Sequence, residues 1–534
     1  MVRTGKYADF SAVSRPFRAH VDIEDVEVEG DIPTELDGTF YRVMQDPYYE
    51  RNYYLNGAKQ IPFDGDGSVS AFRFRDGKAS FQQRYVMTER LVAERKAGRA
   101  LFGMNKSPFS HHPCVRAVID AAANVNVLFH ANKLLAVGEN GPAYELDPNS
   151  LRTIGHDAFP GEIDPKKPFT AHPHVDPETG DLVAFGYEME GLDTPEISIY
   201  IINKDGKVTY RRDIEFRPVG GMFHDCAITR NYIVITRMPF VVDLTDVEKP
   251  GNHQWYYDET CPAYFGLIPR DINKPVRWFK YKNSMPIHTG ASWEDDGKVY
   301  GLQPPHHKKT ARADSTGIFD TTLASHNGLS FLPCRQGPNP DPKDITVNHV
   351  KFCIDPSASL ISWKTQIVFQ GPCEFPRVDE RFLMSKSHIT WLACFDPHKG
   401  TDRPVFQGLD ALAKVDSETG EVEYFSPGPN CLVQEPAFSP RYPGAPEGDG
   451  FLITMIDNMA SGRNELIIQD TRDFQKVVAK VVLPFRLRSA VHGNWVDSSR
   501  IGDADQYAVQ AIDDDLYPHI PTVKDNKVMG GSKL

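Results

Sequence analysis

The sequence predicts an all-β fold, and three observations lead to that prediction. Three Asp-Gly pairs separate apolar or alternating runs, as in type I′ hairpins: Asp76-Gly77, Asp205-Gly206 and Asp296-Gly297. Longer turn sequences at 176–180 (DPETG) and 416–420 (DSETG) each precede a strand-like run. The segment 231–244, NYIVITRMPFVVDL, is rich in the β-branched and aromatic residues that favour strands. Many short strands separated by turns are typical of a sandwich, a barrel or a propeller, and without a clean internal repeat these alternatives stay open.

The remaining segments predict one helix and two irregular regions. The stretch 88–102 (TERLVAERKAGRALF) is rich in Ala, Leu, Arg and Glu, which favours a helix. The region 308–348 is polar and Pro-rich, and predicts a long surface excursion. The residues after 499 are acidic and then contain Pro, and predict a partly ordered tail. Large all-β folds often form one unit, so we expect a single domain over 1–534.

The composition is that of an ordinary globular protein with a net negative charge. Hydrophobic residues make up 40% of the chain and charged residues 25%, which supplies ample material for a core. The net charge of −13 argues against a nucleic acid or an anionic membrane as a partner held by electrostatics. No apolar run is long enough for a transmembrane helix, so we expect no stable membrane insertion.

The chain ends and the cysteines predict an intracellular location. The N-terminal sequence MVRTGKYADFSAVSRP lacks the apolar stretch of a signal peptide, and the eight cysteines are scattered without a CxxC pair. The last three residues, Ser532-Lys533-Leu534, match a peroxisomal address and follow a flexible Gly-Gly pair. We therefore expect a peroxisomal or otherwise cytoplasmic protein, with a peroxisomal import receptor as a partner.

Four of the 18 histidines differ from the others in their sequence context. A lone histidine is more often a hydrogen-bonded core or surface residue than a metal ligand. Four, however, lie at the edges of apolar strand-like runs: His172, His224, His288 and His492. They are so far apart along the chain that only the tertiary fold could bring them together. Four neutral imidazoles suit iron, because they leave its 2+ charge uncompensated and positions open for O2.

Histidine ligands need an acceptor for the second ring nitrogen, and this acceptor is usually a carboxylate. Three glutamates in apolar or Pro/Gly-rich surroundings are candidates: Glu139, Glu374 and Glu435. An unpaired carboxylate would be costly in such surroundings. Judged by residue context alone, however, solvated loop carboxylates are the preferred interpretation.

Seven segments, in order along the chain, resemble the carotenoid cleavage oxygenase family, and within it the lignostilbene and isoeugenol oxygenase branch. They are GTFYR (38–42), FDGDG (63–67), AERKAGRALFG (93–103), AHPHVDPETG (171–180), MFHDCAITRNY (222–232), QEPAF (434–438) and LPFRLRSAVHGNW (483–495). The resemblance implies a seven-bladed β-propeller over roughly residues 20–498, with a partly ordered tail at 499–534. It also implies a cap of helices and loops that roofs a substrate tunnel, with insertions at 88–122 and 303–348.

The resemblance assigns roles to the candidate residues. It implies that His172 is a ligand and His174 is not, and that His224, His288 and His492 complete the set. It implies that Glu139, Glu374 and Glu435 orient three of the four ligands, which replaces the solvated-loop interpretation. Fe(II) would then bind O2 beside a substrate double bond, and both oxygen atoms would add to it, giving two carbonyl products. No organic cofactor is expected, because the alkene supplies the electrons.

The sequence departs from the family pattern in the substrate pocket. Stilbene-cleaving relatives hold the substrate phenol with a Tyr and a Lys, whose positions fall here at Asn105 and Gly138. Lys106 and Lys133 are candidate substitutes. Phe63 keeps the position expected to stack on an aromatic ring. Val125 replaces a Thr beside the open iron position, which preserves the shape but loses a polar contact.

These features predict a non-haem Fe(II) dioxygenase that cleaves the C=C bond of an aromatic substrate. A phenylpropenoid, a vinyl phenol or a stilbene would give two carbonyl products such as an aromatic aldehyde. The alternative substrate class is an apocarotenoid. A branch that isomerises and hydrolyses retinyl esters is disfavoured, because the segment 88–109 is cationic and only weakly apolar. A non-catalytic interaction scaffold is disfavoured because all seven candidate His and Glu positions fit one metal site.

Overall fold

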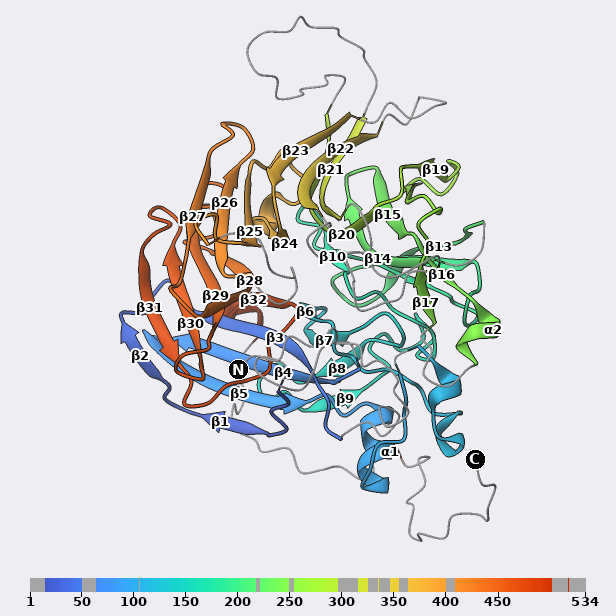
Figure 1. Ribbon diagram of the computed structural model, residues 1–534, viewed down its shortest axis with the longest axis horizontal. Helices are drawn as coiled ribbons and strands as arrows, with labels where there is room; N and C mark the ends of the chain where they lie inside the picture. Colours follow the sequence, from blue (N-terminus) through green and yellow to red (C-terminus); the bar gives the residue numbers. More distant parts are fainter. Residues whose placement is uncertain are drawn as a thin grey trace, which may run out of the picture.

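β-Sheets dominate the computed structural model of the protein. It describes residues 15–49, 64–104, 106–217, 221–248, 254–295, 316–324, 335, 346–354, 364–399, 409–501 and 517. Within these ranges the strands form seven sheets of four or five strands and one two-stranded sheet. Figure 1 shows the larger sheets arranged in chain order around a common centre. The all-β prediction is confirmed, and the protein is a β-propeller.

Five of the sheets have four strands each, connected in chain order. The first contains β6 (Asn126–His130), β7 (Lys133–Val137), β8 (Tyr144–Leu146) and β9 (Thr153–Gly155). The second contains β10 (His174–Val175), β11 (Leu182–Tyr187), β12 (Glu196–Ile202) and β13 (Val208–Glu215). The third contains β14 (Met222–Ile228), β15 (Tyr232–Met238), β18 (Tyr264–Pro269) and β19 (Arg277–Lys280), with the small hairpin of β16 (Phe240–Val242) and β17 (Trp255–Tyr257) inserted.

The last two four-stranded sheets follow the same pattern. One contains β20 (Met285–Asp295), β21 (Thr316–Ala324), β22 (Val347–Ile354) and β23 (Lys364–Gln370). The other contains β24 (Cys373–Arg377), β25 (Ile389–Cys394), β26 (Ala411–Asp416) and β27 (Val422–Phe425). Neighbouring strands in these sheets are antiparallel, so short turns suffice to connect them.

Two five-stranded sheets close the ring by combining strands from both ends of the chain. One has the order β1-β5-β4-β3-β32, with β1 (Val21–Ile23), β3 (Gly38–Asp46), β4 (Asp66–Arg75), β5 (Lys78–Tyr85) and β32 (Gly493–Asp497). The other has the order β2-β31-β30-β29-β28, with β2 (Glu27–Gly30), β28 (Cys431–Pro440), β29 (Gly450–Asn458), β30 (Arg463–Asp470) and β31 (Val477–Val482). Each sheet thus pairs an early strand with a late one, which covers edges that would otherwise stay open.

One terminal strand of each larger sheet lies beside a terminal strand of the next sheet around the centre. β10 contacts β14, β14 contacts β20, β20 contacts β24, β24 contacts β28, β28 contacts β32, and β32 contacts β6. Each of these strands is also the terminal strand of its sheet. Side chains that point inward from these strands therefore meet, although they are far apart along the chain.

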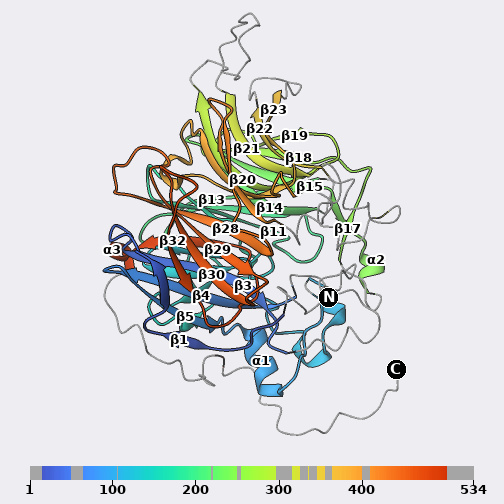
Figure 2. The same ribbon diagram turned by 60° about the vertical axis from the view of Figure 1, so that its left-hand side comes forward.

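The predicted helix exists but is shorter than expected. Helix α1 spans Glu89–Ala97, begins after Thr88, whose side chain accepts a hydrogen bond from the Leu91 N–H, and ends at Gly98. Gly98 has a φ of 66° in the left-handed region that glycine adopts without steric cost, which ends the helix there. In Figures 1 and 2, α1 lies at the margin of the ring, and its apolar residues belong to one buried cluster with residues of β3 to β7.

The other helical segments are short. The 3-10 helices η3 (Pro108–Ser110) and η4 (Pro113–Val115) fall within the predicted cap insertion 88–122. Elsewhere are α2 (Leu244–Val247), η6 (Glu380–Phe382) and α3 (Ser498–Ile501). Among the described residues, no helix combines the length and apolarity needed to cross a membrane.

The expectation of a surface insertion over 303–348 is wrong for part of that range. Strand β21 pairs with β20 on one side and with β22 on the other, so residues 316–324 lie inside a sheet. The misleading feature is their polarity: TGIFDTTLA contains three threonines and an aspartate, but threonine is β-branched and suits strands. The rest of the range up to 345, apart from Arg335, lies outside the described residues.

The predicted Asp-Gly turns have different outcomes. Asp76 and Gly77 join β4 to β5 with φ values of 51° and 72°, which confirms a two-residue turn with both central residues left-handed. Asp205 and Gly206 instead lie in a five-residue loop between β12 and β13, in which Gly206 alone has a positive φ. Asp296-Gly297 and the tripeptide 532–534 lie outside the described residues. The peroxisomal address therefore stays a prediction.

Candidate metal centre

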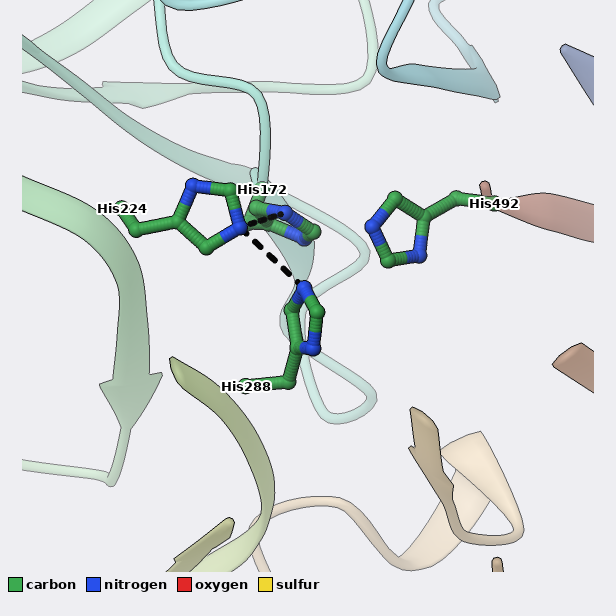
Figure 3. A group of neighbouring side chains, drawn as sticks. All are labelled: His172, His224, His288 and His492. Carbon is green, nitrogen blue, oxygen red and sulfur yellow. Dashed lines mark hydrogen bonds between the residues drawn. The ribbon is translucent and has the colours of Figure 1, made fainter. Parts of the chain in front are cut away.

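Four histidine rings converge at the centre of the ring of sheets. His224 lies on β14 and His288 on β20, while His172 and His492 lie immediately before β10 and β32. Figure 3 shows the four rings directed at one point from four different elements. The Nε2 atom of His224 is 3.1 Å from both the His172 Nε2 and the His288 Nε2. One ring nitrogen from each of the four lies within 4.8 Å of the others.

Irregularities in the inner strands occur at the site residues. The β14–β15 register shifts between Phe223 and Cys226, on either side of His224. The β20–β21 register shifts between Pro286 and Thr289, on either side of His288. The register of β28 shifts in the same way between Val433 and Pro436. Such bulges turn a side chain away from the regular alternation and are frequent beside active sites.

Three glutamates accept hydrogen bonds from the outer nitrogens of three of these histidines. The His288 Nδ1 lies 2.6 Å from the Glu374 Oε2, and the His492 Nδ1 lies 2.9 Å from the Glu435 Oε1. The His224 Nδ1 forms a short hydrogen bond with the Glu139 Oε1. An ionised carboxylate only accepts, so each Nδ1 carries the proton and each Nε2 presents a lone pair to the centre.

The arrangement of the inner nitrogens fits a bound cation. Once His224 and His288 donate through Nδ1, their Nε2 atoms are both acceptors, so two neutral rings cannot hydrogen-bond across the 3.1 Å between them. The buried Nε2 of His492 has no hydrogen-bond partner. Two nitrogens about 2.1 Å from one metal ion and at right angles would lie about 3.0 Å apart. The donor set therefore fits a metal ion.

Burial favours the neutral form of two of the four histidines, His172 and His492. Burial lowers the pKa of His172 well below its usual value, and the neighbouring histidines lower it further. Burial also lowers the pKa of His492, against the opposing effect of Glu435. Burial acts the same way on His288, but there the charge and the hydrogen bond of Glu374, together with the charges of Asp225 and Glu435, outweigh it and raise the pKa. A neutral imidazole is the form that binds a metal.

The glutamates have further partners that the sequence analysis did not identify. The Tyr187 hydroxyl donates to the Glu139 Oε2 at 2.6 Å, and the Lys106 Nζ lies 2.8 Å from the same hydroxyl. The Arg377 guanidinium lies 3.3 Å from the Glu435 Oε2 and contributes to the lowered pKa of that carboxyl. These contacts join side chains that are far apart along the chain, so no local sequence pattern could reveal them.

Phe375 is a further residue that the sequence analysis missed. Its ring stacks on the His288 ring with centroids 5.7 Å apart, and it meets the His492 ring edge-on at 5.6 Å. Its φ of 56° is unusual for a residue with a side chain, and such conformations cluster at functional sites. The sequence signal was present in GPCEFPRV, where Phe375 lies between the candidate Glu374 and a proline.

The structure locates two of the four predicted pocket residues. Val125 and Gly138 are close together, because a Cβ added to Gly138 would lie 3.8 Å from the Val125 Cγ2. Phe63 and Asn105 lie outside the described residues. Of the candidate substitute lysines, Lys106 is 3.1 Å from Glu188 as well as bonding Tyr187, and Lys133 bonds Glu145 at 2.6 Å. Both lysines therefore have acidic partners within the protein.

Comparison with known proteins agrees with this geometry. The chain matches the family model described as retinal pigment epithelial membrane protein over residues 14–497. It is 38% identical over 504 residues to the resveratrol cleavage oxygenase 1 of Botryotinia fuckeliana, covering 92% of this chain and 86% of that one. It is 34% identical over 488 residues to the isoeugenol monooxygenase of Pseudomonas nitroreducens, covering 90% and 96%.

A solved structure supports the same assignment at the level of the fold. The crystal structure of the lignostilbene dioxygenase of Pseudomonas brassicacearum superposes with a TM-score of 0.83. The two proteins are 32% identical, and the match covers 91% of this chain and 98% of that one. The resemblance drawn from the sequence motifs is confirmed. The chain belongs to the carotenoid cleavage oxygenase family, which includes the retinal pigment epithelial membrane protein, and it carries a four-histidine metal-binding group at the centre of its propeller.

Proposed function

We propose that the protein is a non-haem Fe(II) dioxygenase that cleaves the C=C bond of an aromatic alkene with O2. The observation that carries the proposal is the convergence of four histidine nitrogens, three of them backed by glutamates. In the reaction the double bond breaks and each of its carbons gains one oxygen atom, so one O2 and one alkene give two carbonyl products. The alkene is oxidised and O2 is reduced, and no further reductant is required.

The ligand set and the proposed reaction together favour iron among the common metals. Four imidazoles and no bound carboxylate or thiolate leave the full charge of a divalent ion in place, and imidazole suits iron, copper, nickel and zinc. Iron is the one that supplies the required chemistry, because Fe(II) activates O2 toward an adjacent alkene. His172, His224, His288 and His492 would hold the ion.

The chain's own residues would fix the site and protect it from water. Glu139, Glu374 and Glu435 hold three rings in one tautomer, so their inner lone pairs stay aligned on one point. Glu374 is fully buried and the four histidines are mostly buried, which limits the access of bulk water. Phe375 supports two of the ring planes from one side.

The relatives support an aromatic alkene as the substrate class. Their names refer to resveratrol, lignostilbene and isoeugenol, each of which has a C=C bond beside an aromatic ring. We therefore infer a stilbene, phenylpropenoid or vinyl phenol as the substrate here. An apocarotenoid is the alternative, and it would share the metal chemistry while lacking the aromatic ring.

Turnover of an alkene panel by Fe(II)-loaded protein in air tests the proposal. We expect aromatic aldehydes from resveratrol, a lignostilbene, isoeugenol or 4-vinylguaiacol, and no cleavage product from an apocarotenal. With ¹⁸O₂ we expect one labelled oxygen in each product, because a dioxygenase transfers both atoms of O2. A monooxygenase would label only one of the two products. Cleavage of the apocarotenal alone would overturn the substrate class. An iron-loaded protein that turns over nothing and consumes no O2 would overturn the oxygenase proposal.

Restoring a lysine at position 138 tests how a substrate phenol is held. A Cβ at Gly138 would be in ordinary contact with its nearest neighbours, at 3.8 Å, so the position accepts a side chain. We expect Gly138→Lys to lower the KM for a 4-hydroxystilbene about tenfold, since a hydrogen bond to a charged group contributes about 1.5–3 kcal/mol. Gly138→Met, with a similar length and no charge, is the control. An equal KM change in both variants would contradict the prediction.

Two structural features are proposed together with this function. We infer that the seven larger sheets are the seven blades of one propeller, and that the chain forms a single domain around it. The closure of both five-stranded sheets by strands from opposite ends of the chain supports this.

We also infer that the segment 88–122 contributes to a cap over the substrate entrance. The reach of Lys106 from this segment to Tyr187 and Glu188 supports that placement.

A further inference from the structure

The second histidine of the AHPH motif has a definite place in the structure. His174 lies two residues after His172 and is absent from the four-histidine group. Its Nε2 instead lies 2.9 Å from the Oδ1 of Asp225, the residue that follows His224. His174 therefore links the chain segment of one predicted ligand to that of the next.

Asp225 also links the chain segment of His224 to that of His288. Its Oδ2 accepts a hydrogen bond from the backbone N–H of Thr289 at 2.7 Å and lies 3.0 Å from the Thr289 hydroxyl. Thr289 follows His288 directly. The Oδ1 also accepts the backbone N–H of Cys226 at 2.7 Å. Asp225 is 1% exposed, so water does not replace these bonds.

Further bonds reinforce the same three segments. The Thr289 hydroxyl lies 2.8 Å from the Cys226 carbonyl oxygen, and the Cys226 thiol lies 3.7 Å from the His172 carbonyl oxygen. His174, Asp225 and Cys226 bring a nitrogen, an oxygen and a sulphur close enough to hold a metal of their own. The Oδ1 of Asp225, however, already accepts from His174 and from the Cys226 N–H, and its Oδ2 accepts the Thr289 N–H, so the cluster has the contacts of a structural clamp.

We propose that Asp225 is a positioning residue that, with His174 and Thr289, sets the spacing of His172, His224 and His288. The three ligands come from three different sheets, and pairing within a sheet does not fix the distance between sheets. One buried carboxylate bonded to all three segments does fix it. Charge-assisted hydrogen bonds are short and strong, which suits this role. The inference rests on the proposed metal site and concerns residues that do not touch the metal.

The test measures metal release and the ligand field as well as turnover. Protein loaded with Co(II) is challenged with excess EDTA, and the Co(II) absorption bands are recorded before release, because they report ligand geometry. We expect Asp225→Ala to release the metal about 10- to 100-fold faster and to shift the bands, as changes behind metal ligands typically do. Asp225→Asn keeps one acceptor oxygen, and we expect an intermediate rate.

The His174 variants guard against a simple folding failure. We expect His174→Phe, which removes one bond at a partly exposed position, to speed release about 3- to 10-fold, below the range given for Asp225→Ala. We expect His174→Gln, whose amide can still donate to Asp225, to restore release to near the wild-type rate. His130→Phe is the matched control: the buried His130 bonds the Asn203 carbonyl oxygen at 2.8 Å, outside the four-histidine group. It should lower the melting temperature and leave metal release unchanged.

The outcomes separate this inference from the proposed function. A wild-type protein that takes up no metal overturns the metal site and this inference with it. A wild-type protein that holds the metal, together with a folded Asp225→Ala variant of equal release rate and unchanged spectrum, overturns the positioning role alone. Faster release in both Asp225 variants and in His174→Phe, with recovery in His174→Gln, supports it.

Discussion

Replacement of His288 by alanine is expected to abolish metal retention and turnover while the protein stays folded. The substitution removes one of four metal-facing nitrogens. The Nε2 of His288 lies 3.1 Å from that of His224, the same distance that separates the Nε2 atoms of His172 and His224. The fold should survive because β20 is held by backbone pairing with β21, which the side chain does not provide. We expect the iron content per chain to fall to background.

Iron analysis, circular dichroism and O2 uptake measure this effect together. His130→Ala is the matched control, because His130 is also a buried, hydrogen-bonded histidine on a strand but is not part of the four-histidine group. It should keep its iron and its activity. Turnover by His288→Ala at the wild-type rate would show that His288 is not a ligand.

Replacement of Glu374 by glutamine is expected to lower activity about 10- to 100-fold, as is typical for residues that orient a metal ligand. Glu374 is 0% exposed, and its Oε2 accepts both the His288 Nδ1–H and the Phe375 N–H. A glutamine has nearly the same shape but no charge, so it supports the ring less strongly. We expect weaker iron retention and a lower kcat, with KM for the alkene little changed.

A second glutamate–histidine pair provides the control for this variant. Glu447 accepts a hydrogen bond from the Ser387 hydroxyl at 2.6 Å and lies 3.3 Å from the His388 Nε2, outside the four-histidine group. Glu447→Gln should affect stability alone. If Glu374→Gln and Glu447→Gln had the same small effect on kcat, the orienting role of Glu374 would be refuted.

Local elements were predictable where the residues of a short segment favour one backbone conformation by themselves. The turn at Asp76-Gly77 follows from two residues that tolerate a positive φ, and the start of α1 follows from the capping hydroxyl of Thr88. The helix end was misplaced because the favourable residues continue past Gly98, whose left-handed backbone stops the helix. Strand β21 was missed because its composition is polar, and its backbone pairs with β20 and β22, whose pairing the sequence does not display.

The site residues were predictable in type and only partly in role. Residue context identified four histidines at strand edges, but it left the glutamates as solvated carboxylates. The structure contradicts that interpretation, because Glu139, Glu374 and Glu435 each bond one of the histidines from a different strand or turn. The resemblance to the family, rather than the pattern itself, had pointed to these pairs.

The linear sequence was enough to predict an all-β member of the carotenoid cleavage oxygenase family with four candidate histidines. Strand pattern and motif order are properties of the linear chain, so they can be read without coordinates. The three-dimensional packing was needed to show which side chains meet: the bulges at His224 and His288, the stacking of Phe375 and the bonds of Asp225 to two other sheets. The physical reason is that a metal site depends on distances of a few ångströms between residues hundreds of positions apart, and these distances are set by how the sheets pack around their common centre.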